Sequence, residues 1–185
     1  MAKKRDALTQ AALDLFVEKG IQAATTKEIA RRARISEGTI YRHFHSKEEM
    51  ALKLFLTYME QFAQALEQGV APFWRPAEKL KADIKNFLDF ARRQPTIYKY
   101  VVLAHHSELK KVSAEKLKPK EVFVRIIREG IAKGEFRKMD PNLAAAMIIG
   151  MLARVNLFLE HGLIRLSYKK VVEEVGRASL AIVAV

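Results

Sequence analysis

Apolar residues recur at intervals of three and four positions along most of the 185-residue chain. This spacing places them on one face of an α-helix. No segment alternates apolar and polar residues as a half-buried strand does, and no Asn-Gly or Asp-Gly pair marks a hairpin. The pattern therefore predicts an all-α protein of about nine helices.

The first helix is expected over residues 5–19, with Gly20 as its left-handed stop. Residues 69–76, which include two prolines, form the clearest break, and the polar, Lys-rich residues 107–118 are expected to be a loop. Later helices are predicted over residues 46–68, 76–94, 95–106, 119–133, 141–161 and 167–183.

Three helix-start signals follow one another in residues 25–49. Thr25 with Glu28, and Ser46 with Glu49, have the spacing of capping boxes, in which the hydroxyl caps an amide three residues on and the glutamate reaches back. Between these two signals, Ser36 begins a second short helix. The segment is therefore predicted to contain three closely spaced helix starts.

The first two of these helices are short and are joined by a tight turn over residues 34–36. The first is expected to bury Ile29, Ala30 and Ala33, and the second carries Ile40 and Phe44 four apart on one face. Two short helices joined in this way, with the second polar on its outer face, form a helix-turn-helix that reads DNA.

This region resembles the tetracycline-repressor (TetR/AcrR) family of bacterial and archaeal transcriptional regulators. Arg34 departs from the family, which often has glycine in this turn, so either Arg34 adopts a positive φ at a cost of about 1 kcal/mol or the turn differs slightly from that of the family. About the first 55 residues are covered closely, and the resemblance rests on residues 11–16, 20, 25–30, 35–44 and 47–49.

The resemblance implies a three-helix DNA-binding domain, residues 1–50, followed by a helical effector-binding and dimerisation domain, residues 51–185. It implies a repressor that binds a palindromic operator as a homodimer and is released by a small-molecule effector. Two alternatives stay open. One is an architectural DNA-binding protein without an effector, and the other is an enzyme or interaction module with an incidental helix-turn-helix.

The outer face of the second short helix is expected to enter the major groove. Arg42 can pair with guanine O6 and N7, and Thr39 can touch a base edge. Arg42 and His43 can equally be solvated surface residues, and Glu37 is either a cytosine contact or a helix-start carboxylate. Tyr41 and Lys47 resemble the family's phosphate contacts. The predicted DNA-binding residues are Thr26, Lys27, Ser36, Gly38, Thr39, Tyr41, Arg42, His43 and Lys47.

The net charge of +12 is compatible with DNA binding but does not identify it. Residues 1–68 carry a net charge of +2 and residues 69–185 a net charge of +10, so most of the excess lies outside the helix-turn-helix. Within residues 1–47 the balance is 10 basic to 5 acidic residues, so the DNA-reading part is itself basic.

Composition also bounds the environment of the protein. No cysteine is present, which excludes disulfides and thiolate metal sites and is typical of a reducing compartment. The basic start is interrupted by Asp6, Gln10 and Asp14, unlike a signal peptide. The longest apolar run, residues 143–153, is too short to span a bilayer. A cytoplasmic protein without a membrane partner is expected.

No enzyme signature is present in the sequence. His105 and His106 are adjacent, so on a helix they point in different directions, and no acid/base or metal-binding set has helical spacing. We expect neither an enzyme nor a bound cofactor or metal.

Aromatic residues of the helices that begin at Pro76, Pro95 and Pro119 can line an effector pocket, or they can simply be core. No buried-looking carboxylate is evident near them, which argues against a cationic ligand, whereas nearby Lys and Arg residues tolerate an anionic headgroup. The expected effector is therefore mostly apolar, with room for an anionic group. The predicted effector-binding residues are Phe62, Phe87, Phe90, Tyr98, Phe123, Ile127 and Met151.

The helix after Pro141 is apolar nearly all round, and a single core needs only one stripe of it. Small residues on its spare face and on the last helix permit close packing across a two-fold axis, as the family resemblance also implies. The alternative is that both helices fill the core of one protomer. The predicted dimer-interface residues are Ala146, Gly150, Ala153, Val172, Gly176, Ser179 and Val183.

Overall fold

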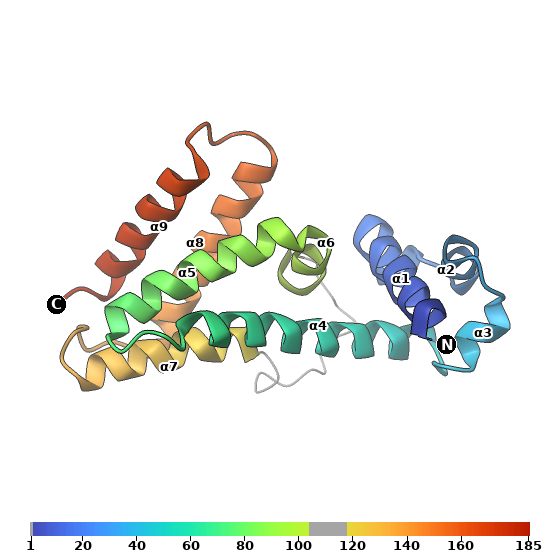
Figure 1. Ribbon diagram of the computed structural model, residues 1–185, viewed down its shortest axis with the longest axis horizontal. Coiled ribbons are helices and arrows are strands. Elements are labelled where there is room, and N and C mark those ends of the chain that lie inside the picture. The colour runs from blue at the N-terminus through green and yellow to red at the C-terminus, as the bar shows by residue number, and fades with distance from the viewer. Residues whose placement is uncertain (1, 104–117) are drawn as a thin grey trace. The chain divides into compact units, whose positions relative to one another are not determined.

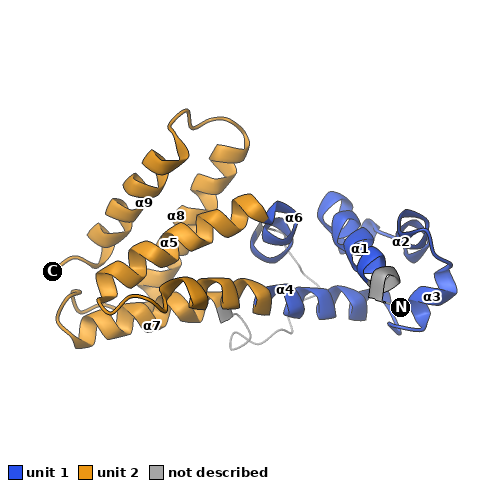
Figure 2. Ribbon diagram, in the orientation of Figure 1, with its two compact units in different colours: residues 1–59, 94–116 blue, residues 60–93, 117–185 orange. Residues whose placement is uncertain are grey.

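The computed structural model describes residues 2–103 and 118–185, and these residues contain helices and no strands (Figure 1). The chain divides into two compact units (Figure 2). Unit 1 comprises residues 1–59 and 94–116, and unit 2 comprises residues 60–93 and 117–185. Within the described residues the all-α prediction is confirmed.

Unit 1 contains helices α1 to α3 and the first part of α4. Their bounds are Ala2–Ala23 for α1, Thr26–Ala33 for α2, Glu37–Tyr41 for α3 and Lys47–Val70 for α4. The unit is completed by a short helix α6, Pro95–Tyr98, which continues into a π-helical turn η1, Lys99–Leu103.

The interior of unit 1 joins segments that are distant in sequence. The buried Tyr100 hydroxyl donates to the carbonyl oxygen of Ala51 at 2.8 Å. The Tyr100 ring stacks on Phe16 with centroids 6.1 Å apart and meets Phe55 edge-on at 6.2 Å. These contacts attach α6 and η1 to the core that α1 and α4 form.

Local signals at the helix ends are mostly confirmed. Gly20 has φ 80° and ψ 159°, so it breaks α1 as expected, although the helix resumes to Ala23. The Thr25–Glu28 capping box is complete. Arg34 closes α2 in the left-handed region at φ 55° and ψ 45°, which is the first of the two alternatives for this turn.

The prediction of a second capping box is wrong for one of its two hydrogen bonds. The Ser46 hydroxyl accepts from the Glu49 amide at 3.0 Å, but the Glu49 carboxylate accepts from the amide of His45 and not from that of Ser46. The Ser36 side chain makes no cap hydrogen bond at the start of α3.

Unit 2 contains the end of α4 together with four helices whose bounds lie within a few residues of those expected. They are α5, Pro76–Arg93; α7, Lys118–Ala132; α8, Pro141–Glu160; and α9, Tyr168–Val183. Helix α5 packs against α7, α8 and α9. The predicted loop at residues 107–117 and the end of the predicted helix 95–106 lie outside the described residues.

Helix α8 leaves an apolar face uncovered in the protomer. Leu143, Met147 and Phe158 are all exposed, Leu143 by 58%. Among the described residues, α8 is the one helix long and apolar enough, by length and composition alone, to cross a membrane. The sequence analysis did not identify α8 as long enough to cross a membrane, because it counted only the uninterrupted apolar run of residues 143–153.

Candidate nucleic-acid interface and sensor core

Helices α2 and α3 bury one face and expose the other. Ile29 and Ile40 are almost fully buried, and Phe44 packs beside Ile40 as the chain leaves α3. Tyr41 is 52% exposed, and Arg42 is exposed next to it. The apolar positions thus fix the helix pair and leave polar side chains outward.

Hydrogen bonds connect five of the predicted DNA-binding residues in two separate groups, Thr26 with Tyr41 and Ser36 with Thr39 and Arg42. The Thr26 hydroxyl donates to Glu37 and lies 3.4 Å from the Tyr41 hydroxyl. Thr39 Oγ1 lies 2.9 Å from Ser36 Oγ and accepts from Arg42 Nη2 at 3.0 Å. The remaining three outward residues, Lys27, Gly38 and His43, are also exposed.

Gly38 is not required by the packing of the protein. A Cβ atom added there would have no protein heavy atom within 4 Å outside the helix's own backbone. The absence of a side chain therefore serves no internal contact. It is compatible with close approach by a molecule outside the protein.

Lys47 is placed differently from the other predicted residues. Its ammonium donates to the carbonyl oxygens of Gln22 at 3.0 Å and Ala24 at 2.9 Å, and its side chain is only 17% exposed. Lys47 therefore caps the carbonyl end of α1. Its predicted phosphate contact stays a prediction.

Two ion pairs hold α1 against α2 beside this surface. Glu18 pairs with Arg32 at 2.8 Å and Lys19 with Glu28 at 2.6 Å. The hydrogen bond from Lys19, assisted by Thr25, lowers the pKa of Glu28 to about 2. Glu28 therefore stays ionised and keeps both the ion pair and the cap of α2 across the physiological pH range.

In unit 2, four predicted effector residues form one aromatic cluster. The ring of Phe62 lies 4.4 Å from Phe90 and 5.2 Å from Phe87, and Phe87 lies 6.2 Å from Phe123. Ile127 is buried and Met151 is half-buried in the same unit, whereas Tyr98 belongs to unit 1.

A buried carboxylate that the sequence analysis missed lies one turn before Phe87. Asp83 is fully buried, and neither of its oxygens has a hydrogen-bond partner among the described residues. Burial, reinforced by the charge of Glu67, raises the pKa of Asp83 well above its usual range, and Arg125 opposes the effect. The expectation of no buried carboxylate is wrong; the signal was an aspartate between Leu80 and Phe87 on an apolar face.

A second buried carboxylate on α5 is paired. Asp89 accepts from the Tyr168 hydroxyl and from Lys85, both at 2.6 Å. Burial opposes ionisation, but these donors hold the pKa of Asp89 below its usual value, while burial and Asp89 raise that of Tyr168. Because Arg92 also stacks on the Tyr168 ring, this group fastens the start of α9 to α5.

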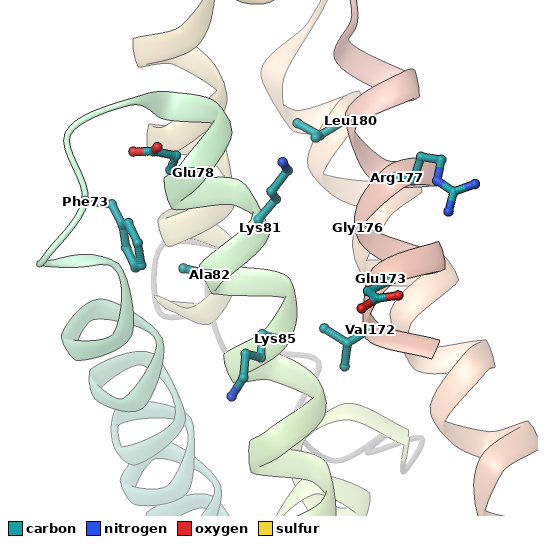
Figure 3. A pocket seen from close by; sticks show the side chains of 10 residues that line it. All are labelled: Phe73, Glu78, Lys81, Ala82, Lys85, Val172, Glu173, Gly176, Arg177 and Leu180. Carbon is teal, nitrogen blue, oxygen red and sulfur yellow. The ribbon is translucent and has the colours of Figure 1, made fainter. Parts of the chain in front are cut away.

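Two pockets lie on unit 2, and neither is lined by the aromatic cluster. Figure 3 shows the first, of about 650 Å³, with side chains from α5 and α9 and Phe73 from the preceding loop. The second, of about 350 Å³, lies among α4, α5 and α7. It is lined by Glu67, Val70, Ala71, Phe73, Trp74, Lys79, Arg125, Ile126 and Glu129.

The predicted dimer residues divide by exposure. Ala146 and Gly150 are exposed on α8, Ala153 and Val172 are half-buried, and Gly176 is buried. Ser179 and Val183 are fully buried within the protomer. Side chains without accessible surface cannot contact a second copy. The prediction that Ser179 and Val183 lie in the dimer interface is therefore wrong.

The fold and the outward polar face define a helix-turn-helix DNA-binding regulator. Residues 8–54 match the model of bacterial regulatory proteins of the tetR family, and residues 74–157 match the tetracyclin repressor-like C-terminal domain. The chain belongs to the TetR family of transcriptional regulators, which are not enzymes.

Similar proteins include a regulator of fatty acid metabolism and a transcriptional repressor. The chain is 30% identical to the fatty acid metabolism regulator protein of Bacillus subtilis, over 82% of both chains. It is 28% identical to the transcriptional repressor KstR2 of Mycolicibacterium smegmatis, over 74% of this chain and 69% of that one.

Solved structures agree on the fold. The fatty acid degradation regulator FadR of Bacillus halodurans is 26% identical, with a TM-score of 0.81 over 96% of this chain and 94% of that one. FadR of Bacillus subtilis, solved in complex with stearoyl-CoA, is 24% identical, with a TM-score of 0.80 over 97% and 99%.

Proposed function

We propose that this regulator is a repressor that binds a palindromic operator as a homodimer and releases it on binding a small molecule. The observation that carries the proposal is the outward face of α2 and α3, where one hydrogen-bonded group contains Thr26 and Tyr41 and another contains Ser36, Thr39 and Arg42. Side chains ordered in this way lose less conformational entropy when they contact DNA.

Dimer formation is supported by the uncovered face of α8. A second copy would cover Leu143, Met147 and Phe158, and Gly150 would let the two helices approach closely. A lipid occupant is less suitable because Arg154 and Asn156 lie within the same helix. The proposal therefore keeps the protein in the cytoplasm and without a membrane partner.

The proposed effector is mostly apolar and carries an anionic group, as a fatty acyl thioester does. Support comes from the aromatic cluster of unit 2 and from the relatives that regulate fatty acid metabolism. Helix α4 carries residues of both units, so a ligand that favours one arrangement of unit 2 can change the spacing of the two DNA-reading helices. The proposed functional boundary follows residue 50, with DNA binding in residues 1–50.

A footprinting experiment tests the proposal. Genomic fragments selected by the protein should show protection of two half-sites with centres about 34 Å apart or a multiple of it. Protection should then be lost on addition of a long-chain acyl-CoA, and free coenzyme A is the matched control.

Two results would contradict this proposal. Protection without any sequence preference would favour an architectural DNA-binding protein. Protection that persists across a panel of acyl thioesters and other metabolites would exclude release by an effector of this class.

A further inference from the structure

One face of α5 is directed at α4 and α7. Phe87 and Phe90 on this face contact Phe62 of α4, and Phe87 also contacts Phe123 of α7. Asp83 lies four residues before Phe87 and therefore shares its face. Polar atoms at this position are enclosed by the interior of unit 2.

Two polar side chains on α5 have buried atoms without partners among the described residues. They are both oxygens of Asp83 and the side-chain nitrogen of Asn86. The Asn86 amide lies against Gly69 of α4, so closely that a Cβ at Gly69 would be 1.7 Å from its nitrogen. Asp83 and Asn86 are three residues apart, which places them one turn apart on the helix.

The charges that face Asp83 come from three helices. Glu67 of α4 pairs with Arg125 of α7 at 2.5 Å, and Lys79 of α5 pairs with Glu129 of α7 at 2.7 Å. Because Arg125 and Lys79 are engaged with other carboxylates, neither neutralises Asp83. Burial, reinforced by the charge of Glu67, raises the pKa of Asp83 and so favours its protonated form, in which the carboxyl group can donate a hydrogen bond.

A buried donor without an acceptor is destabilising, and native proteins rarely keep one unless something else binds there. The 350 Å³ pocket lies near Asp83, since Glu67 and Arg125, whose charges act on Asp83, are among the residues that line it. Its apolar wall includes Val70 and Ile126. Its volume is at the low end for small-molecule sites.

We propose that Asp83 and Asn86 form a two-donor site for an oxygen acceptor of the effector, namely the carbonyl oxygen of an acyl group. The choice of an acyl group rests on the proposed function, whereas the choice of an acceptor rests on the two unpaired donors. A cationic ligand would gain from an ionised Asp83 but nothing from the Asn86 amide. The apolar part of the ligand lies against Val70 and Ile126.

The test compares octanoyl-CoA with S-octyl-CoA, a thioether that lacks the carbonyl oxygen. Binding is measured by calorimetry and by the fluorescence of Trp74, the one tryptophan of the chain, which lines the pocket. Wild type should bind octanoyl-CoA about tenfold more tightly than the thioether, the effect of one or two hydrogen bonds. This preference should decline as the pH rises through the pKa of Asp83, because the ionised group no longer donates.

Variants separate hydrogen bonding from folding. Asp83→Leu should abolish the preference for the carbonyl compound, whereas Asp83→Asn keeps a donor and should retain the preference without its pH dependence. Asn86→Ala should reduce the preference for the carbonyl compound severalfold. Asp89→Asn is the matched control, because it alters a paired buried carboxylate on the same helix. This variant should leave the preference for the carbonyl compound unchanged.

Persistence of the carbonyl preference in both Asp83→Leu and Asn86→Ala would overturn the proposal. Binding of octylamine that tightens with rising pH and is lost in Asp83→Asn would instead establish a cation site. If neither thioester nor thioether binds, the effector class of the proposed function fails. In that case 2-octanone tests the donor site alone: binding that Asp83→Leu abolishes upholds it, and absence of binding refutes it.

Discussion

At the scale of single residues, the strongest departure from expectation is a charge-bearing group placed in the core. Asp83 is fully buried without a hydrogen-bond partner among the described residues, and its pKa is raised by burial. Such a group destabilises the protein in exchange for a function, so its removal has a measurable consequence for stability.

Asp83→Leu should raise the free energy of unfolding by about 1–3 kcal/mol, because it removes a buried unpaired polar group. The native state holds a proton that the unfolded chain releases near pH 4. By linkage, the stability of the wild type falls as the pH rises from about 4 to the native pKa of Asp83, and stays lower above it. The difference between variant and wild type in urea unfolding should therefore grow over that interval. A constant difference would mean that Asp83 does not titrate in the folded protein.

Arg42 and Lys47 are expected to respond differently to removal of their charges. If Arg42 reads a base, Arg42→Ala should weaken operator binding by about 1–3 kcal/mol and relax the preference at one position. Lys47→Met should lower the melting temperature, because the carbonyl oxygens of Gln22 and Ala24 lose their donor.

Electrophoretic mobility assays with operator and random DNA at several salt concentrations check both variants. If Arg42→Ala lost the same amount of affinity for operator DNA as for random DNA, base reading by Arg42 would be contradicted. A Lys47 variant with unchanged stability and a salt slope smaller by about one unit would show that its main partner is a phosphate.

At the scale of helices, α3 is short and its glycine is not needed for packing. Gly38→Ala should stabilise the helix by up to about 1 kcal/mol, since alanine is the better helix former and the added methyl group meets no other part of the protein. The same change should weaken operator binding if DNA approaches this backbone closely. Titration calorimetry and thermal unfolding measure the two effects, with Gln64→Ala as a control because Gln64 is exposed on α4 and lies outside both proposed interfaces. Unchanged operator affinity would exclude a close approach at Gly38.

At the scale of the whole molecule, one protomer does not cover the apolar face of α8. Gly150→Arg should give monomers with unchanged helical content and much weaker operator binding, because a long charged side chain opposes close helix packing. Gln64→Arg, an exposed substitution on α4, serves as the control. Sedimentation and circular dichroism report the outcome. A wild type that sediments as a monomer at micromolar concentration would refute the interface.

The sequence was sufficient where local chemistry decides structure. Thr25 and Glu28 predicted the start of α2, and a positive φ at Arg34 was one of two alternatives for the turn that follows. Ile40 and Phe44 identified the inward face of the DNA-reading helix pair. Each of these features depends on residues a few positions apart, so its physics is visible in a short window of sequence.

Tertiary structure decided what depends on partners distant in the chain. It engaged Lys47 with the carbonyl oxygens of Gln22 and Ala24, and it placed Glu67 and Arg125 beside Asp83. It also buried Ser179 and Val183 within the protomer. Helical periodicity gives the face of each residue but not what covers that face. The sequence by itself therefore determined the class of protein and the DNA-reading motif, and only packing determined which polar groups are satisfied, because burial depends on neighbours from other helices.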